Sequence, residues 1–249
     1  MMKRTLVPAL VLAAAAATPA ISKADISGNV GYNSDYVFRG IFQAESSAFA
    51  GFDYTAGPFY AGTWWADVGA GTETDLYAGF NLGNDKVKFK VGYTGYRYLD
   101  DFDGDYDELN LGLYLGIFAI DVAAGQYDGD KFHQGDPVSG GNQDYVFTSL
   151  TLSPKKGPYY KVGLWSGDFN DHILPNVKTD NPLTAAVEDG DGLYYEIGYN
   201  YTLEDAGVVF GAALDYSTDL IVSPFSNASG EYPDYILTFS IKKNLAPKK

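Results

Sequence analysis

The chain has no cysteine among its 249 residues. Without thiols there is no disulfide framework, no thiolate metal site and no cysteine nucleophile. These absences exclude the disulfide-stapled class of exported proteins and every enzyme that attacks through sulfur.

Basic residues are scarce as well. Lys and Arg number 17 against 32 Asp and Glu, which gives a formal net charge of −15. Nucleic acids and anionic surfaces attract basic proteins, so neither is expected as a partner of this chain. Histidine is limited to His133 and His172, and both lie in long polar stretches. The sequence therefore offers no histidine on a strand for a catalytic triad.

Long apolar runs are missing beyond the N-terminus. The nearest one, residues 109–124, is interrupted by Asn110, Asp121 and two glycines. A helix that spans a bilayer needs about 18 or more apolar residues. We therefore read this run as two strands joined by a tight turn near Gly116 and Ile117.

The N-terminus has the three regions of a signal peptide. Lys3 and Arg4 precede an apolar run at 6–17, and Ala24 closes a small-residue cleavage site. We predict a cleaved leader over residues 1–24, with cleavage after Ala20 as the second choice. A membrane anchor is disfavoured because the run is short and is bracketed by prolines. Residues 25–249 then form one all-β unit in an exported protein.

Strand formers and turn residues are abundant, with 21 Tyr, 15 Phe and 29 Gly. Polar and apolar residues alternate at period two, as in the opening stretch where Ile26, Val30 and Tyr36 oppose Asn29 and Asp35. The predicted strands, about twelve in number, cover 25–39, 47–55, 58–67, 74–83, 86–98, 106–115, 117–127, 143–152, 158–167, 192–203, 206–217 and 233–243.

The connections between these strands alternate in length. Short turns fall at 55–58, 83–86, 116, 153–158 and 204–207. Long loops fall at 99–105, 128–142, 168–191 and 218–233, while 40–46 and 68–73 are of moderate length. Transmembrane barrels show this segregation, with the short turns on the periplasmic side. A soluble sandwich has no reason to sort its loops in this way.

One stripe of each strand is apolar, as in Leu109, Leu111, Leu113 and Leu115. We expect this stripe to face lipid, with aromatic girdles at its ends. The expected girdle residues are Tyr36, Phe38, Tyr54, Tyr60, Tyr93, Tyr201, Tyr216 and Tyr235. A soluble sandwich or lipocalin-like barrel would instead turn the apolar stripe inward.

Several motifs also resemble a known family. The run Ser34–Gly40 (SDYVFRG), followed by 50–54, 59–64 and 75–79, is similar to the TorF-like porins of proteobacteria, which carry the Gcw_chp domain. The resemblance covers nearly the whole chain after the leader. It implies an outer-membrane β-barrel and says little about the substrate.

The opposite stripe of the strands is polar or charged. Because a charge that faces lipid near the midplane costs about 2 to 4 kcal/mol, this stripe is expected to line the lumen. The alternative is that these groups pair with one another and fill the interior as struts. The expected lumen residues are Asn29, Asp53, Lys88, Lys90, Glu108, Asp121, Lys161, Glu196, Asp215 and Lys242.

Asp35, Tyr36 and Arg39 of the family-like motif lie where the first strand meets the loops. Arg39 could act at the pore mouth or form an ion pair with Asp35 or a loop carboxylate. We favour the structural role, since Arg pairs readily with carboxylates.

The acidic run 100–108 suggests calcium, but Tyr106 stands at the invariant glycine of an EF-hand and Gly112 at its terminal Glu. No catalytic, metal or cofactor site is expected, and the chain is not expected to be an enzyme.

The sequence therefore predicts an all-β fold, a single transmembrane antiparallel β-barrel of about twelve strands. We expect it in the outer membrane of a Gram-negative bacterium, surrounded by lipid, as a narrow channel for small polar solutes. The alternative is a closed structural or recognition barrel that binds a partner through its acidic loops. No oligomeric state is assigned.

Overall fold

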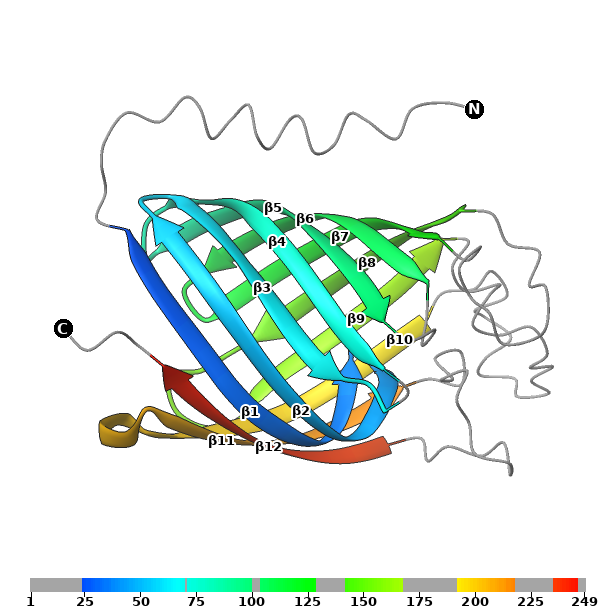
Figure 1. The fold of residues 1–249 in the computed structure, drawn as a ribbon. Helices are drawn as coiled ribbons and strands as arrows, with labels where there is room; N and C mark the ends of the chain where they lie inside the picture. Colours follow the sequence, from blue (N-terminus) through cyan, green and yellow to red (C-terminus); the bar gives the residue numbers. More distant parts are fainter. Residues whose placement is uncertain are drawn as a thin grey trace.

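The computed structural model describes residues 24–69, 71–99, 104–128, 142–167, 192–217 and 235–245. Within these residues twelve strands form a closed antiparallel barrel, in which β1 pairs with β12 and every other strand pairs with its sequence neighbours (Figure 1). The strands are β1 (Asp25–Phe38), β2 (Ile41–Ala56), β3 (Phe59–Asp67), β4 (Thr72–Gly83), β5 (Val87–Leu99), β6 (Asp105–Leu115), β7 (Phe118–Asp128), β8 (Asn142–Leu152), β9 (Tyr159–Gly167), β10 (Gly192–Leu203), β11 (Val208–Ser217) and β12 (Tyr235–Leu245).

Helix is nearly absent from the described part of the chain, where one 3-10 turn, η2 (Glu204–Ala206), joins β10 to β11. None of the described residues belongs to a helix long and apolar enough to cross a membrane.

The predicted strands and the tight turn at Gly116 and Ile117 are confirmed, with one marked difference in β2. This strand begins at Ile41 instead of residue 47, so the predicted loop 40–46 is wrong. Arg39 and Gly40 have φ values of 53° and 85°, the left-handed pair that closes a two-residue hairpin. The ladder to β1 then continues with a register shift between Tyr36 and Val37.

The barrel has two unlike ends. At one end, here the turn end, β1 begins and β12 finishes, and short turns join β2 to β3, β4 to β5, β6 to β7, β8 to β9 and β10 to β11. At the other end, here the loop end, lie the β1–β2 and β3–β4 turns and the remaining connections (Figure 1). The predicted leader and most of the four predicted long loops lie outside the described residues.

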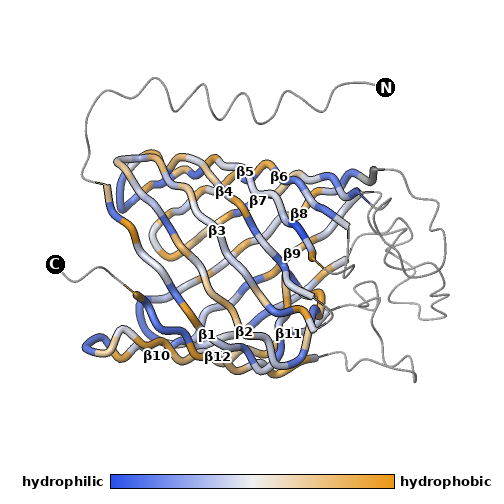
Figure 2. Tube along the Cα trace, viewed as in Figure 1, coloured by the Kyte–Doolittle hydropathy of each residue, from blue (hydrophilic) through white to orange (hydrophobic). Residues whose placement is uncertain are grey.

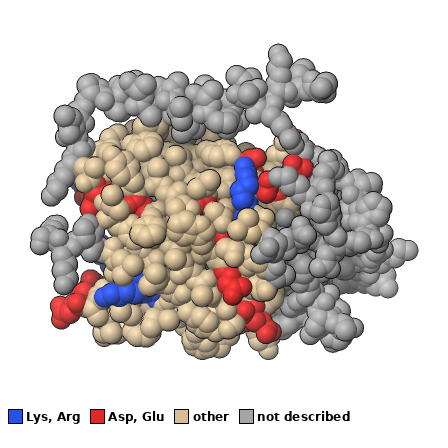
Figure 3. Space-filling model, viewed as in Figure 1, with Lys and Arg blue, Asp and Glu red and all other residues tan. Residues whose placement is uncertain are grey.

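The outer face of the barrel is apolar. Leu76 on β4 and Phe239 on β12 are each 56% exposed, and Leu111 on β6 is 47% exposed. Orange and blue segments alternate along the strands in Figure 2, as a sheet with one apolar face requires. In Figure 3 charged side chains lie mostly toward the two ends of the visible face.

Glycines within the strands make room for tyrosine rings inside the barrel. A Cβ on Gly125 of β7 would come within 2.3 Å of the Tyr145 ring, and one on Gly163 of β9 within 2.2 Å of the Tyr194 ring. Each ring therefore lies directly against the backbone of a neighbouring strand. Glycine inside a strand often marks such a close approach.

Candidate functional site

The β1–β2 hairpin bends away from the barrel wall and crosses the lumen near the loop end. Its tip is Phe38-Arg39-Gly40-Ile41, and Ile41 is buried among residues of β7 to β10 on the opposite wall. Both faces of the hairpin therefore lie inside the barrel. For this reason the expected place of Tyr36 and Phe38 in an aromatic girdle is wrong: Tyr36 is 8% exposed and donates a hydrogen bond to Glu73 over 2.8 Å.

Arg39 forms a bidentate ion pair with Glu108 of β6. Nη1 lies 2.5 Å from Oε1 and Nη2 lies 3.0 Å from Oε2. Within the part of the chain that the structure describes, the partner is a strand carboxylate and not Asp35, which corrects the sequence prediction. Folding brings the two residues together across the lumen although they are far apart in the chain.

Glu108 is almost completely buried and well supplied with donors. Besides Arg39, the hydroxyls of Tyr145 and Tyr96 donate to it over 2.8 and 3.1 Å, and Asn110 Nδ2 donates over 3.0 Å. A buried carboxylate is costly unless such partners satisfy it. The ion pair is therefore a built feature of the interior.

Aromatic rings surround the Arg39 guanidinium. Its central carbon lies 4.6 Å from the ring centroids of Phe38 and Phe147 and 5.6 Å from that of Trp165. Trp165 Nε1 also donates to the backbone oxygen of Arg39 over 2.9 Å, and Ser217 Oγ donates to the oxygen of Gly40 over 2.8 Å. The hairpin tip is therefore fastened to β6, β9 and β11.

Two hydrophobic clusters pack around the hairpin among the described residues. On one side Ile41 packs with residues of β7 to β10. On the other side Tyr36 packs with Ala66 and Val68, and Trp64 lies edge-on to Tyr36 at 5.6 Å between ring centroids. The loop half of the lumen is consequently filled with apolar rings.

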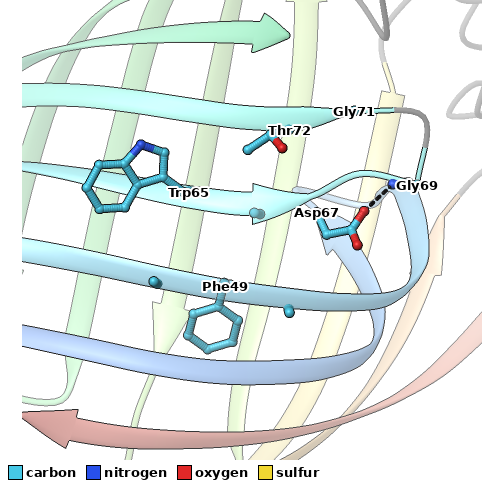
Figure 4. Close-up of a pocket in the computed structure, with 9 residues that line it drawn as sticks. Phe49, Trp65, Asp67, Gly69, Gly71 and Thr72 are labelled. Carbon is cyan, nitrogen blue, oxygen red and sulfur yellow. Dashed lines mark hydrogen bonds between the residues drawn. The ribbon is translucent and has the colours of Figure 1, made fainter. Parts of the chain in front are cut away.

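The β3–β4 turn supports the second cluster. Asp67 Oδ1 accepts a hydrogen bond of 2.7 Å from the backbone N–H of Gly69, as Figure 4 shows. This contact holds the turn, in which Val68 is 2% exposed and packs toward the hairpin. The hollow beside the turn, lined by Phe49, Trp65 and Thr72 among others, is uncharged except for Asp67.

The turn half of the lumen is polar. Asp53 accepts a hydrogen bond of 2.6 Å from the Tyr77 hydroxyl, and Asp121 accepts one of 2.7 Å from the Tyr114 hydroxyl. Lys88 lies over the Tyr114 ring at 4.5 Å, and Lys90 lies over the ring of Tyr60 at 5.3 Å. Tyr60 thus points inward, which corrects its predicted place in the outer girdle.

A third group of charges lies on β9 to β11. Lys161 and Glu196 form an ion pair of 3.3 Å, and Tyr159 donates a hydrogen bond to Glu196. Asp215 lies opposite Glu196 in the register of the β10–β11 ladder, and it is 7% exposed. Asn29 lies on the lumen side of β1, beside Gly51. Lys242 lies on the lumen side of β12, because it is two residues from Ser240, which lines a cavity.

Three cavities follow one another through the lumen. A cavity of about 590 Å³ in the turn half shares Lys90, Thr94 and Tyr96 with a central cavity of about 480 Å³ beneath Arg39. The central cavity shares Val37 and Glu196 with a third cavity of about 210 Å³. The third cavity lies beside the hairpin, between Asp35 and the strands β10 to β12.

Sequence reasoning missed the residues that hold the hairpin. Tyr96, Tyr145, Trp165 and Ser217 come from four different strands, and each contacts the tip or its ion pair. The aromatic residues among them sit on the polar stripe of their strands. Large aromatic residues on an otherwise polar stripe are the sequence feature that could have predicted a packed loop half of the lumen.

The comparisons with known proteins agree with this architecture. A family model described as "Bacterial protein of unknown function (Gcw_chp)" matches residues 16–128. A Gcw_chp domain is present. It includes the whole hairpin and the strands β1 to β7.

The structure is similar to solved outer-membrane porins. The KdgM porin matches with a TM-score of 0.51 at 6% identity, over 89% of this chain and 99% of that one. KdgM in complex with disordered oligogalacturonate matches with a TM-score of 0.50 at 5% identity, over 89% and 99% of the two chains. A chain from a structure on "in-meso Crystallization of Membrane Proteins" matches with a TM-score of 0.55 at 12% identity, over 90% and 85%. These identities establish the fold alone.

One curated protein also matches in part. A riboflavin kinase of Aspergillus clavatus is 27% identical over 88 residues, 35% of this chain. The match spans 38% of that protein's length. This partial match does not assign that protein's activity to the chain.

Proposed function

We propose that the protein is a porin-like channel of the bacterial outer membrane that passes small polar solutes by passive diffusion. The observation that carries this proposal is the series of three cavities with polar and charged linings that share lining residues from the turn half to the hairpin. Their charges have both signs, with Lys88, Lys90 and Lys161 facing Asp53, Asp121, Glu196 and Asp215. A lumen of this kind favours hydrated solutes of modest size.

The apolar outer face supports a location in lipid. Outside the hairpin, each strand of the closed barrel pairs with a neighbour on both sides, which is what a bilayer demands of a spanning structure. We place the turn end in the periplasm and the loop end outside, following the arrangement of other outer-membrane barrels. The motifs at 34–40 and 50–54 further support membership of the TorF-like porins.

A second candidate is a closed barrel that acts through its loops. The two hydrophobic clusters around the hairpin favour it, because they fill the loop half of the lumen. In that case the charged residues of the turn half are internal struts.

Single-channel recording in a planar bilayer separates the two candidates. We expect the purified, refolded protein to give discrete steps of small conductance, as fits a barrel between the filled size of about 8 strands and the open size of about 16. Silence from correctly folded protein, checked by the gel shift of unheated barrels, would favour the closed barrel.

A further inference from the structure

We infer that the tip of the β1–β2 hairpin is the constriction that determines selectivity, and that the Arg39–Glu108 pair sets both its width and its charge. The inference rests on the proposed channel function and deepens it. It assigns the narrowest part of the route to a turn of only two residues, instead of to one of the long loops.

The first argument is the position of the tip. Arg39 lines the central cavity, and Val37 lines both this cavity and the smaller one beside the hairpin. Any solute that passes from the turn half to the loop half must therefore pass the hairpin. The space beside it, about 210 Å³, is less than half of the central cavity of about 480 Å³.

The second argument is the backbone of the turn. Two-residue hairpins with positive φ at both positions strongly prefer Asn-Gly, because Asn tolerates the left-handed region and a long side chain does not gain from it. Here Arg39 occupies the first position at φ 53°. The residue is thus unfavourable for the turn itself, and its side chain supplies the compensating contacts in the lumen.

The third argument is the charge. The Arg39 side chain is 17% exposed on the cavity side, whereas that of Glu108 is 0% exposed behind it. The pair is neutral as a unit, so it contributes little net field to the route. Loss of either partner changes the net charge at the narrowest point by one unit.

These arguments predict opposite shifts from two single substitutions. Arg39→Asn keeps the preferred turn sequence but leaves Glu108 unpaired, so the channel should become more cation-selective. Glu108→Gln keeps the side-chain shape but leaves Arg39 unpaired, so the channel should become more anion-selective. At an intermediate effective dielectric, a unit charge a few Å from the route should change the K⁺/Cl⁻ permeability ratio about three- to tenfold.

Arg97→Asn is the matched control. Arg97 forms a 2.6 Å ion pair with Asp107, but Arg97 is 37% exposed and lies on the outward stripe of β5, near the loop end. Its removal deletes the same charge and a similar contact outside the lumen. The control should fold like the variants and leave the permeability ratio within about twofold of the unchanged protein, since exposed pairs contribute little and are screened.

A further measurement tests whether the hairpin is fastened by this pair. Both lumen variants should raise the conductance, because the tip loses its main anchor. Guanidinium ion at millimolar concentration should then reduce the conductance of the Arg39→Asn channel, since it can refill the site between Glu108 and the rings of Phe147 and Trp165. It should have no such effect on the Arg97→Asn channel.

The outcomes are distinct. Opposite shifts of reversal potential in a KCl gradient support the inference. A conducting protein whose permeability ratio is unmoved by both lumen variants overturns the inference and leaves the channel function standing. Silence of the unchanged protein and of all variants, each folded by the gel-shift assay, overturns both.

Discussion

The two halves of the lumen differ although the same strands build both. In the loop half, Tyr127 and Tyr194 are each 1% exposed and pack with the in-folded hairpin. In the turn half, Tyr60, Tyr77 and Tyr114 line a cavity of about 590 Å³ with lysines and carboxylates. Tyrosine is common to both halves, so the amino acid does not decide whether the interior is filled.

The hairpin makes the difference. In the loop half it adds a further layer of side chains to a barrel that would otherwise have room for a channel of intermediate size. Its rings fill the space between opposite walls, and the charge of Arg39 at its tip is matched by Glu108. In the turn half no segment of the described residues crosses the lumen, so the tyrosine rings border open cavities, and Tyr77 donates a hydrogen bond to Asp53.

The largest expected effect is on protease cleavage in intact cells, which tests which end of the barrel faces outward and is nearly all-or-none. Trypsin added to intact cells should cut after Lys131 or Lys178, in the predicted loops 128–142 and 168–191. It should spare Lys86 and Lys155 at the turn end until the outer membrane is permeabilised. Cleavage confined to Lys86 or Lys155 in intact cells would mean that the turn end faces outward and the packed loop half faces the periplasm.

Removal of a ring from the packed half should cost the most stability. Trp165 is 3% exposed, and Trp165→Ala should lower the free energy of unfolding by about 3 to 5 kcal/mol. Tyr60→Ala in the hollow half is the matched change and should cost about 1 kcal/mol, because its ring borders a cavity. Urea unfolding in lipid vesicles measures both, and equal losses would mean that the two halves are packed alike.

A charge on the outer face should be less tolerated than a charge in the hollow half. Leu113→Arg faces lipid near the middle of β6 and should cost about 2 to 4 kcal/mol. Tyr114→Arg, one residue along, points into the polar half near Asp121 and should cost less. The same unfolding assay compares them, and equal costs would contradict the register of β6.

The acidic loops should have the smallest effect. The run 100–108 and the loop 168–191 are rich in carboxylates, so the outer mouth should favour cations mildly, and the preference should weaken with salt. Changing Asp101, Asp103, Asp105 and Asp107 together to Asn should reduce the preference measured by reversal potential. If it does not change, the charges inside the lumen govern permeation.

The sequence by itself determined the barrel. Period-two alternation, glycine-rich turns and the segregation of short and long connections are local properties, so strands such as β6 and turns such as that at Gly116 and Ile117 could be placed to within a few residues. Outward stripes such as Leu109 and Leu111 follow from the same alternation, because lipid accepts only one face of each strand.

Only the tertiary structure decided the path of the β1–β2 hairpin. The alternation of polar and apolar residues predicts which side chains face lipid and which face the lumen only where a strand is part of the barrel wall. Beyond Asn33 the hairpin leaves the wall, so Tyr36 and Phe38 lie inside the barrel although they belong to the apolar stripe. The partner of Arg39 was equally hidden, since Glu108 lies 69 residues further along the chain. No local pattern encodes which of many carboxylates will face an arginine across a closed barrel; the closure of the sheet and the inward bend of the hairpin together select Glu108.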